Sequence, residues 1–348
     1  MDKGYDAAIA SVIRDGFQDA LPQVLSVQKH LHILAFESMK LLPALSCIND
    51  LETRGLLRPK GVLADTSSGS FAYGMARVAA VRNYRCVIVT DAAVNGDFLG
   101  SLESLGAEVI VVDGPSDGPD LQLKRKKRLE EVVAETGALL LNQYDNPVAA
   151  HSYEAAAAIA ANRLEKIDVL VVPVGTGASS RGLVHYLRRT NPKLHVVAVD
   201  TFCSVLFGLS IGRRRLRGVG NSFLPRNVPY QAIDDVHFVS ADVAYEGTLR
   251  IAESGLGDYG PTSGAAFMVA GAISSERPDD SIMCVFPDRQ FRYADLIAAY
   301  RQQRASISAM IPRSPSDVVN LADITEERQW VSFKWRRRAR EDVLARGH

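Results

Sequence analysis

Short runs of apolar residues alternate with amphipathic stretches along the chain from about residue 60 onward. The apolar runs are rich in Val and Ile and nearly unbroken, which is typical of strands covered on both faces. They predict strands at residues 61–65, 85–90, 108–113, 138–143, 168–174, 195–200, 236–240 and 282–286. Strands that alternate with helices indicate parallel sheets, so the fold class we expect is α/β with open parallel sheets.

The stretches between these strands predict helices. Strong helix formers and glycine stop signals mark residues 41–57, 95–106, 154–164 and 262–273, and the last of these is apolar enough to be buried. Acidic residues follow the basic run at residues 123–131, which favours a solvated helix face over an anion site. After about Arg304 the chain is charged and lacks a strand pattern, which predicts a surface helix or a flexible tail.

Composition and charge narrow the class of protein. A chain of 348 residues can bury a large core, and its length favours two domains over one. Its 40 lysines and arginines balance 40 aspartates and glutamates, so nucleic acid and acidic membranes are disfavoured as partners and small molecules are favoured. No stretch approaches the roughly 20 apolar residues that a membrane span needs. The amino terminus also lacks the apolar centre of a signal peptide, so we expect a cytoplasmic protein.

The cysteines and histidines predict neither a metal site nor a disulfide framework. The cysteines, at positions 47, 86, 203 and 284, are scattered without paired spacing. His30 and His32 alternate in a strand-like stretch but lack further ligands nearby.

Three turns rich in glycine and hydroxyl residues carry the strongest chemical signal. TSSGS (66–70) and GTGASS (175–180) follow predicted strands, and GPTSGAA (260–266) opens a predicted helix. Ligands bind at the carboxyl ends of strands in open parallel sheets, so these turns are expected to face one crevice. GTGASS suits a phosphate because it combines exposed backbone amides, hydroxyls and the amino end of a helix. A plain tight turn is the alternative, and a nucleoside triphosphate is disfavoured because the P-loop lysine is missing.

The order of these motifs resembles the cysteine synthase family, whose members are fold type II enzymes that use pyridoxal 5'-phosphate (PLP). SMKLLPALSCI (38–48) is similar to the family's lysine-bearing helix start, and TSSGS, GTGASS and GPTSGAA follow it in the family's order. LLNQYDNP (140–147) and VFPDRQFRY (285–293) are similar to further family segments, so the likeness covers roughly residues 25–295. AVDTFCSVLFG (198–208) and RGVGNSFLP (217–225) are similar to the siderophore-type branch, the N-(2-amino-2-carboxyethyl)-glutamate synthases.

This resemblance implies a role for each matching residue. Lys40 would hold the cofactor as a Schiff base, which needs an unprotonated amine, and apolar neighbours would lower the lysine's pKa. A surface lysine at a helix start is the alternative. Thr262 would face the pyridine nitrogen with a neutral hydroxyl, which favours β-elimination and replacement over transamination. The residues that would bind the phosphate are Gly175, Thr176, Gly177, Ala178 and Ser179. Those that would bind the substrate's α-carboxylate are Ser67, Ser68, Gly69 and Gln143.

The chain departs from the family around the lysine. Ser70 replaces the asparagine that bonds the cofactor's phenolic oxygen, so we expect a weaker contact there. Leu41 and Leu42 replace an Asp-Arg pair, and HILAFESMK (32–40) lacks the family's proline and glycine. These changes indicate either a new substrate or a decayed active site. The basic cluster RRRLR (213–217) predicts either recruitment of a substrate phosphate or carboxylate, or a solvated loop.

The leading functional hypothesis is β-replacement on O-phosphoserine or O-acetylserine through an aminoacrylate. An amine or another small nucleophile would add to give a non-standard amino acid, such as a precursor of 2,3-diaminopropionate. Cysteine synthesis with sulfide and a non-catalytic, partner-binding relative are the alternatives.

The resemblance also implies an organisation for the chain. We expect a smaller, mobile domain at residues 35–147 that carries the substrate loop. A larger domain, at residues 1–34 and 148–305, would carry the phosphate and pyridine sites, and residues 306–348 would form a C-terminal extension. The expected assembly is a homodimer.

Overall fold

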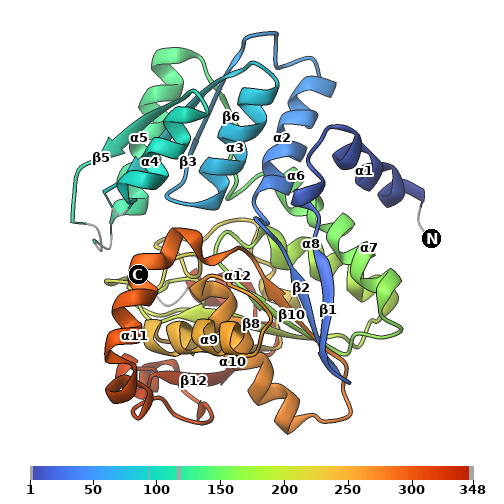
Figure 1. The fold of residues 1–348 in the computed structure, drawn as a ribbon, viewed down its shortest axis with the longest axis vertical. Helices are drawn as coiled ribbons and strands as arrows, with labels where there is room; N and C mark the ends of the chain where they lie inside the picture. Colours follow the sequence, from blue (N-terminus) through green and yellow to red (C-terminus); the bar gives the residue numbers. More distant parts are fainter. Residues whose placement is uncertain (1–2, 93, 116–117, 119, 345–348) are drawn as a thin grey trace.

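Two β-sheets organise the molecule. The computed structural model describes residues 3–92, 94–115, 118 and 120–344, and its strands form one sheet of four strands and one of eight. Figure 1 shows each sheet with its helices as a separate lobe, the smaller lobe above the larger one. The α/β class with parallel sheets, predicted from the apolar pattern, is confirmed.

The smaller lobe is built on a fully parallel sheet with the order β5-β4-β3-β6. Because successive residues of a strand face opposite sides, Leu63 and Ile88 join the core on the side of α3, whereas Ala64 and Val87 pack against α5. The strands are β3 (Val62–Thr66), β4 (Arg85–Asp91), β5 (Ala107–Val112) and β6 (Leu139–Leu140). The helices are α2 (Leu41–Thr53), α3 (Ser70–Val81), α4 (Gly96–Ser104) and α5 (Leu121–Thr136).

The larger lobe contains a mixed sheet with the order β1-β2-β10-β7-β8-β9-β12-β11. The central strands from β2 to β9 are parallel, and antiparallel neighbours, β1 and β12, flank them. The strands are β1 (Gln23–Gln28), β2 (Leu31–Ala35), β7 (Val169–Pro173), β8 (His195–Thr201), β9 (Asp235–Val239), β10 (Ile282–Phe286), β11 (Ser316–Val318) and β12 (Trp330–Lys334). The helices are α1 (Lys3–Arg14), α6 (Pro147–His151), α7 (Tyr153–Arg163), α8 (Ala178–Thr190), α9 (Ala241–Glu253), α10 (Pro261–Glu276), α11 (Ala294–Ser308) and α12 (Arg340–Leu344).

Part of the C-terminal segment, at residues 316–334, belongs to the larger sheet, so the prediction of a surface helix or flexible tail is wrong there and fits only the short helix α12. Strand β12 pairs with β9, and β11 pairs with β12. Trp330 of β12 is fully buried, and its Nε1 donates to His237 Nδ1 at 3.1 Å. The strand was hard to recognise because WVSFK is short and lies between charged stretches. Residues 345–348, which the prediction also covered, lie outside the described residues.

The strand predicted at residues 138–143 is shorter than expected. Only Leu139–Leu140 is strand, because Asn142 takes a left-handed conformation with a φ of +56° and turns the chain. The turn brings Gln143 back to the end of β3, where its backbone nitrogen donates to Asp65 Oδ2 at 3.1 Å. Gln143 therefore lies beside the strand end instead of continuing the sheet.

Candidate active site

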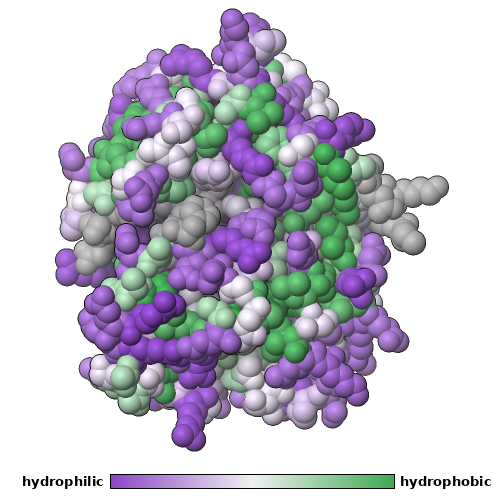
Figure 2. All heavy atoms as spheres, in the orientation of Figure 1, coloured by the Kyte–Doolittle hydropathy of each residue, from purple (hydrophilic) through white to green (hydrophobic). Residues whose placement is uncertain are grey.

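A cavity of about 420 Å³ lies between the lobes, at the carboxyl ends of β3, β4 and β7. Figure 2 shows hydrophilic side chains gathered on the surface between the two lobes. Most of the residues predicted to bind cofactor or substrate line this cavity: Lys40, Ser67, Ser68, Gly69, Ser70, Gln143, Gly175, Thr176, Ser179 and Thr262. The other two, Gly177 and Ala178, belong to the turn at which α8 begins.

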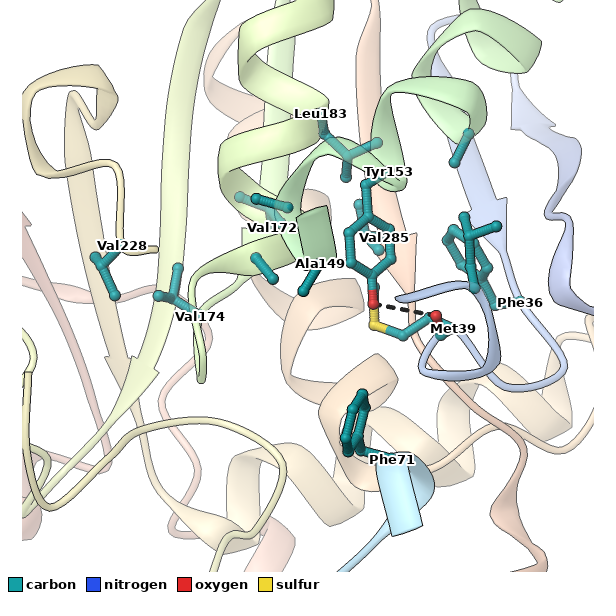
Figure 3. Packing of buried hydrophobic residues seen from close by; sticks show 14 of the residues in the cluster. Phe36, Met39, Phe71, Ala149, Tyr153, Val172, Val174, Leu183, Val228 and Val285 are labelled. Atoms are coloured by element: carbon teal, nitrogen blue, oxygen red, sulfur yellow. Dashed lines mark hydrogen bonds between the residues drawn. The ribbon is translucent and has the colours of Figure 1, made fainter. Parts of the chain in front are cut away.

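Two backbone contacts fix the turn that carries Lys40. Lys40 immediately precedes α2, and Met39 is held through both of its backbone polar groups. The Met39 nitrogen donates to the Pro287 oxygen at 2.8 Å, and the Met39 oxygen accepts from the Tyr153 hydroxyl at 3.0 Å. Figure 3 shows Tyr153 reaching Met39 through the apolar packing around Phe36. These contacts define the path of the turn without the proline and glycine that the family uses.

Lys40 faces the turn that was predicted to bind phosphate. Its Nζ donates to Thr176 Oγ1 at 3.1 Å. Burial lowers the pKa of Lys40 to about 8, although the carboxylates of Asp288 and Asp65 oppose this shift. The neutral amine, which is the nucleophilic form, is therefore far more abundant near pH 7 than on an ordinary lysine. The alternative of a surface lysine does not fit this position.

The turn of residues 175–179 has a backbone path that suits an oxyanion. Gly177 has a φ of +80°, and an added Cβ there would lie 2.4 Å from the Val228 nitrogen, so only glycine fits. Helix α8 begins at Ala178, and the amino end of such a helix attracts negative charge. Asn221 Nδ2 donates to the Gly175 oxygen at 3.4 Å and ties the turn to the neighbouring segment.

The loop after β3 and Gln143 come together from separate parts of the chain. The Ser67 nitrogen donates to the Val89 oxygen at 3.1 Å, and Ser67 Oγ accepts from the Gly69 nitrogen at 3.1 Å. Gln143 is buried, and its Nε2 donates to the Thr66 oxygen at 2.8 Å. The residues predicted to bind a substrate carboxylate therefore lie at one strand end, although Gln143 is far from the loop in sequence.

Thr262 and Ser70 line the cavity with hydroxyls that also contact the protein. Thr262 Oγ1 donates to the Arg217 oxygen at 3.2 Å, and a Cβ at Gly218 would lie 2.5 Å from this Oγ1, so glycine leaves room for it. Ser70 Oγ donates to Asp288 Oδ2 at 3.0 Å. The expected contact of Ser70 with a phenolic oxygen stays a prediction.

Sequence reasoning missed four charged residues that line the cavity: Asp91, Arg125, Asp288 and Asp295. Arg125 is 3% exposed, so the interpretation of its helix face as solvated is wrong at this position. A signal was present, because Leu121, Arg125 and Leu129 are spaced by four residues and share the buried face of α5. Asp288 has no comparable signal, because its partner Ser70 lies 218 residues away in sequence.

The basic cluster at residues 213–217 alternates between cavity and solvent. Arg214 and Arg217 line the cavity. Arg213 and Arg215 are exposed. The solvated interpretation fits Arg213 and Arg215, whereas recruitment of a substrate anion stays a prediction for Arg214 and Arg217.

Neither a membrane span nor a metal cluster is found in the part of the chain that the structure describes. No helix there is long and apolar enough to cross a membrane. No group of three or more His, Cys, Asp or Glu side chains there is placed to hold a metal ion.

The residues of the cavity fit a cofactor that carries both a carbonyl group and a phosphate. An amine of lowered pKa would bind the carbonyl, and the glycine turn before α8 would bind the phosphate. The fold and the cavity thus define an α/β enzyme with an amine-bound, phosphate-bearing cofactor. The chain belongs to the pyridoxal-phosphate dependent enzymes, whose family model matches residues 26–288. It is a PLP enzyme of the cysteine synthase type.

Curated relatives confirm the resemblance to cysteine synthases and to the siderophore-type branch. The N-(2-amino-2-carboxyethyl)-L-glutamate synthase of Ralstonia nicotianae is 32% identical over 265 residues, which cover 75% of this chain and 78% of the relative. Cysteine synthase 3 of Caenorhabditis elegans is 29% identical over 241 residues, which cover 68% of this chain and 70% of the relative. The cystathionine beta-synthase of Apis mellifera is 29% identical over 252 residues, which cover 69% of this chain but only 49% of the relative.

Solved structures support the fold. The crystal structure of O-ureido-L-serine synthase superimposes with a TM-score of 0.73 at 22% identity, covering 78% of this chain and 90% of that one. The fold type II class is therefore confirmed.

Proposed function

We propose that this enzyme replaces the β-substituent of a serine derivative, O-phosphoserine or O-acetylserine, with an amine or another small nucleophile. One observation carries the proposal: the Lys40 amine lies 3.1 Å from the hydroxyl of the phosphate turn, in the same cavity as the serine-rich loop at residues 67–70. The product would be a non-standard amino acid, such as a precursor of 2,3-diaminopropionate.

The cofactor, when bound, supplies an electron sink for carbanion chemistry at the substrate's α-carbon. The protein supplies the proton transfers and the orientation. The Lys40 amine would hold the cofactor and, once released by the substrate, take the proton from the α-carbon. Thr262 would place a neutral hydroxyl near the pyridine nitrogen, which favours loss of the β-substituent over transamination.

The substrate's α-carboxylate would bind in the loop at residues 67–69, with Gln143 opposite. We propose that the smaller lobe, including residues 35–147, closes on the larger one when the carboxylate binds. Closure would exclude water from the reacting atoms and so prevent hydrolysis of the reactive intermediate.

The names of the relatives support an amine as the nucleophile. The Ralstonia nicotianae relative is named for a product that joins an amino-carboxyethyl group to glutamate. Sulfide is the competing nucleophile, because Cysteine synthase 3 of Caenorhabditis elegans is a relative of similar identity.

Substitution of Lys40 tests the proposed cofactor site. The purified wild-type protein should be yellow, and Lys40→Ala should be colourless because it lacks the amine that binds the cofactor. Turnover should fall at least about 100-fold, since loss of a general base alone costs roughly 10²–10⁴-fold. Lys193→Ala, at an exposed lysine, is the matched control and should keep both properties. Full colour and activity in Lys40→Ala would refute the assignment.

The pH dependence of cofactor loading gives a second test of Lys40. The neutral fraction of the amine falls about tenfold for each pH unit below its pKa, so loading of the apoenzyme should accelerate as the pH rises toward about 8 and then level off. Stopped-flow absorption would measure the rate. A loading rate that stays constant from acidic pH to above 8 would contradict a role for this amine.

The identity of the substrate can be tested by measuring the leaving group. The wild-type holoenzyme should release phosphate from O-phosphoserine or acetate from O-acetylserine, and mass spectrometry should identify the product formed with an amine or with sulfide. If neither serine derivative loses its leaving group, the proposed reaction is wrong even if Lys40 holds the cofactor.

We also propose that the protein is a homodimer, as the resemblance implies. Val24, Leu25 and Val27 on the edge strand β1 are only partly buried. Figure 2 shows apolar side chains along the side of the molecule where β1 lies in Figure 1. Sedimentation velocity should give twice the mass of one chain, and the mass of a single chain at micromolar concentration would contradict the proposal.

A further inference from the structure

The described chain ends with β12, a turn and the short helix α12, which pack onto the larger lobe. In the turn, Arg336 and Arg337 both take a left-handed conformation, with φ values of +58° and +57°. This conformation is unfavourable for residues other than glycine, so tertiary contacts must hold it. The two backbone nitrogens donate to the oxygens of Asp234 and Ile233 at 2.8 Å. Val343 of α12 is buried, so the helix is fixed as well.

Two side chains of this C-terminal turn and helix bind the backbone of residues 221–230, which we call the bridging segment. Trp335 Nε1 donates to the Tyr230 oxygen at 3.1 Å, and the two rings pack with centroids 6.1 Å apart. Arg340 Nη2 donates to the Leu224 oxygen at 2.9 Å. Trp335 is 1% exposed and Arg340 Nε is buried, so both contacts are shielded from water. Shielding strengthens such hydrogen bonds.

The bridging segment contacts the turn proposed to bind the cofactor's phosphate. A Cβ at Gly177 would lie 2.4 Å from the Val228 nitrogen, so the two backbones are in direct contact. Asn221 Nδ2 donates to the Gly175 oxygen at 3.4 Å. Figure 3 shows Val228 near Val174, the residue that precedes the turn, in the same apolar cluster. A shift of the bridging segment would therefore move the backbone of the phosphate turn.

The bridging segment also holds residues 141–146, where the chain passes from the smaller lobe to the larger one. Asn227 is fully buried, and its backbone nitrogen donates to the Tyr144 oxygen at 3.3 Å. Its Nδ2 donates to the Asn146 oxygen at 3.0 Å and to the Gln143 oxygen at 3.4 Å. The position of Gln143, which would face the substrate's α-carboxylate, thus depends on the same segment.

The bridging segment cannot hold its own shape by regular hydrogen bonding. Residues 221–229 form no helix or strand. The backbone groups of such a segment need partners elsewhere in the protein. The C-terminal turn and helix supply two of these partners, at Leu224 and Tyr230. These contacts lie on either side of Val228, which touches the phosphate turn.

We propose that Trp335 and Arg340 are positioning residues, which act on the phosphate turn and on Gln143 through the bridging segment. Neither residue touches the cavity, and both lie outside residues 26–288, which the family model matches. The inference rests on the proposed positions of the cofactor's phosphate and the substrate's carboxylate. It assigns the C-terminal extension a role in cofactor binding in addition to completing the sheet.

Binding of two forms of the cofactor tests this role. The full-length chain, freed of cofactor, would be titrated with PLP and with pyridoxal, which lacks the phosphate. Arg340→Met keeps an apolar stem and removes the bond to the Leu224 oxygen. We expect it to weaken PLP binding by about 5- to 50-fold, the usual range for coupling between separate sites. The affinity for pyridoxal should stay close to that of the wild type, because pyridoxal does not use the phosphate turn.

Three further variants separate positioning from general loss of structure. Trp335→Phe keeps a buried ring and removes only the Nε1 donor, so it should show the same selective loss of PLP affinity. Arg340→Lys retains a cationic donor and should restore part of the affinity. Arg313→Met, at an exposed arginine of the same extension, is the matched control and should bind both ligands like the wild type.

The outcomes distinguish this proposal from the proposed function. Wild-type affinity for PLP in both Arg340→Met and Trp335→Phe would overturn it, and so would equal losses for PLP and pyridoxal. A wild type that binds pyridoxal as tightly as PLP would refute the phosphate turn itself, and the positioning role with it. Failure of the enzyme to convert serine derivatives would count only against the proposed reaction, because binding is measured without an amino-acid substrate.

Discussion

Tyr153 holds the turn before Lys40 through a single hydroxyl. The ring is fully buried, and its hydroxyl donates to the Met39 oxygen, next to Lys40. Tyr153→Phe would keep the packing and remove only this hydrogen bond. We expect the free energy of unfolding to fall by about 1 kcal/mol and the cofactor to dissociate faster, because the Lys40 turn would lose one of its two anchors. Urea denaturation and dialysis against a carbonyl-trapping amine would measure these effects.

A second tyrosine provides the control for this substitution. Tyr84 donates to Glu52 Oε1 at 2.7 Å, at a position that does not line the cavity. Tyr84→Phe should also lower stability slightly but leave cofactor retention unchanged. Equal cofactor retention in wild type and Tyr153→Phe would show that the hydroxyl does not position the turn.

At the residue scale, the sequence could predict that the glycine turns and Lys40 lie at one cavity, because short local motifs mark them. Gly177 needs a left-handed backbone, and a phosphate turn is short enough to be visible as a motif. Asp288 acts through residues that are distant in sequence, so no local pattern identifies it. Arg125 was misinterpreted because the basic run around it suggested solvent, although its spacing from Leu121 and Leu129 indicated burial.

At the scale of elements, β12 is the part of the sheet that was not predicted, and its role can be tested. Trp330 is buried between β9 and the helices of the larger lobe, where its ring nitrogen contacts His237. Trp330→Ala should lower the free energy of unfolding by about 3–5 kcal/mol, the usual cost of deleting a large buried ring. Chemical denaturation of the apoenzyme would measure the loss.

The same C-terminal segment offers a matched control. Val319 follows β11 and is 86% exposed, so Val319→Ala should change stability by less than about 0.5 kcal/mol. A wild-type unfolding midpoint for Trp330→Ala would mean that β12 is a dispensable addition to the sheet.

The Val- and Ile-rich runs of interior strands such as β4, β7 and β8 were predicted correctly because these strands are covered on both faces. β12 has few residues, and its pattern is obscured by charged neighbours. β6 was overestimated because the apolar run continues past Leu140, while the backbone turn at Asn142 depends on tertiary contacts. Residue patterns thus indicated which segments are extended more reliably than where a strand ends.

At the scale of the whole molecule, the sequence indicated parallel sheets but not their strand order. β10 lies between β2 and β7 in the larger sheet, and these neighbours are separated by more than a hundred residues. Such long-range pairings depend on the packing of complete lobes. Contacts across the cavity, such as Arg217 with Asp91, are equally invisible in local patterns.

The chain passes between the lobes at residues 36–40 and again at residues 141–146. A rotation of one lobe relative to the other would have its axis near these two connecting segments. Atoms close to the segments would therefore be displaced least. Lys40 lies in the first connection, whereas β5 is the sheet edge farthest from β6 and would be displaced most by such a rotation. If the smaller lobe closes as we propose, Lys40 would lie close to the pivot, and the lobes would open to exchange product for substrate with little displacement of a cofactor bound to this lysine.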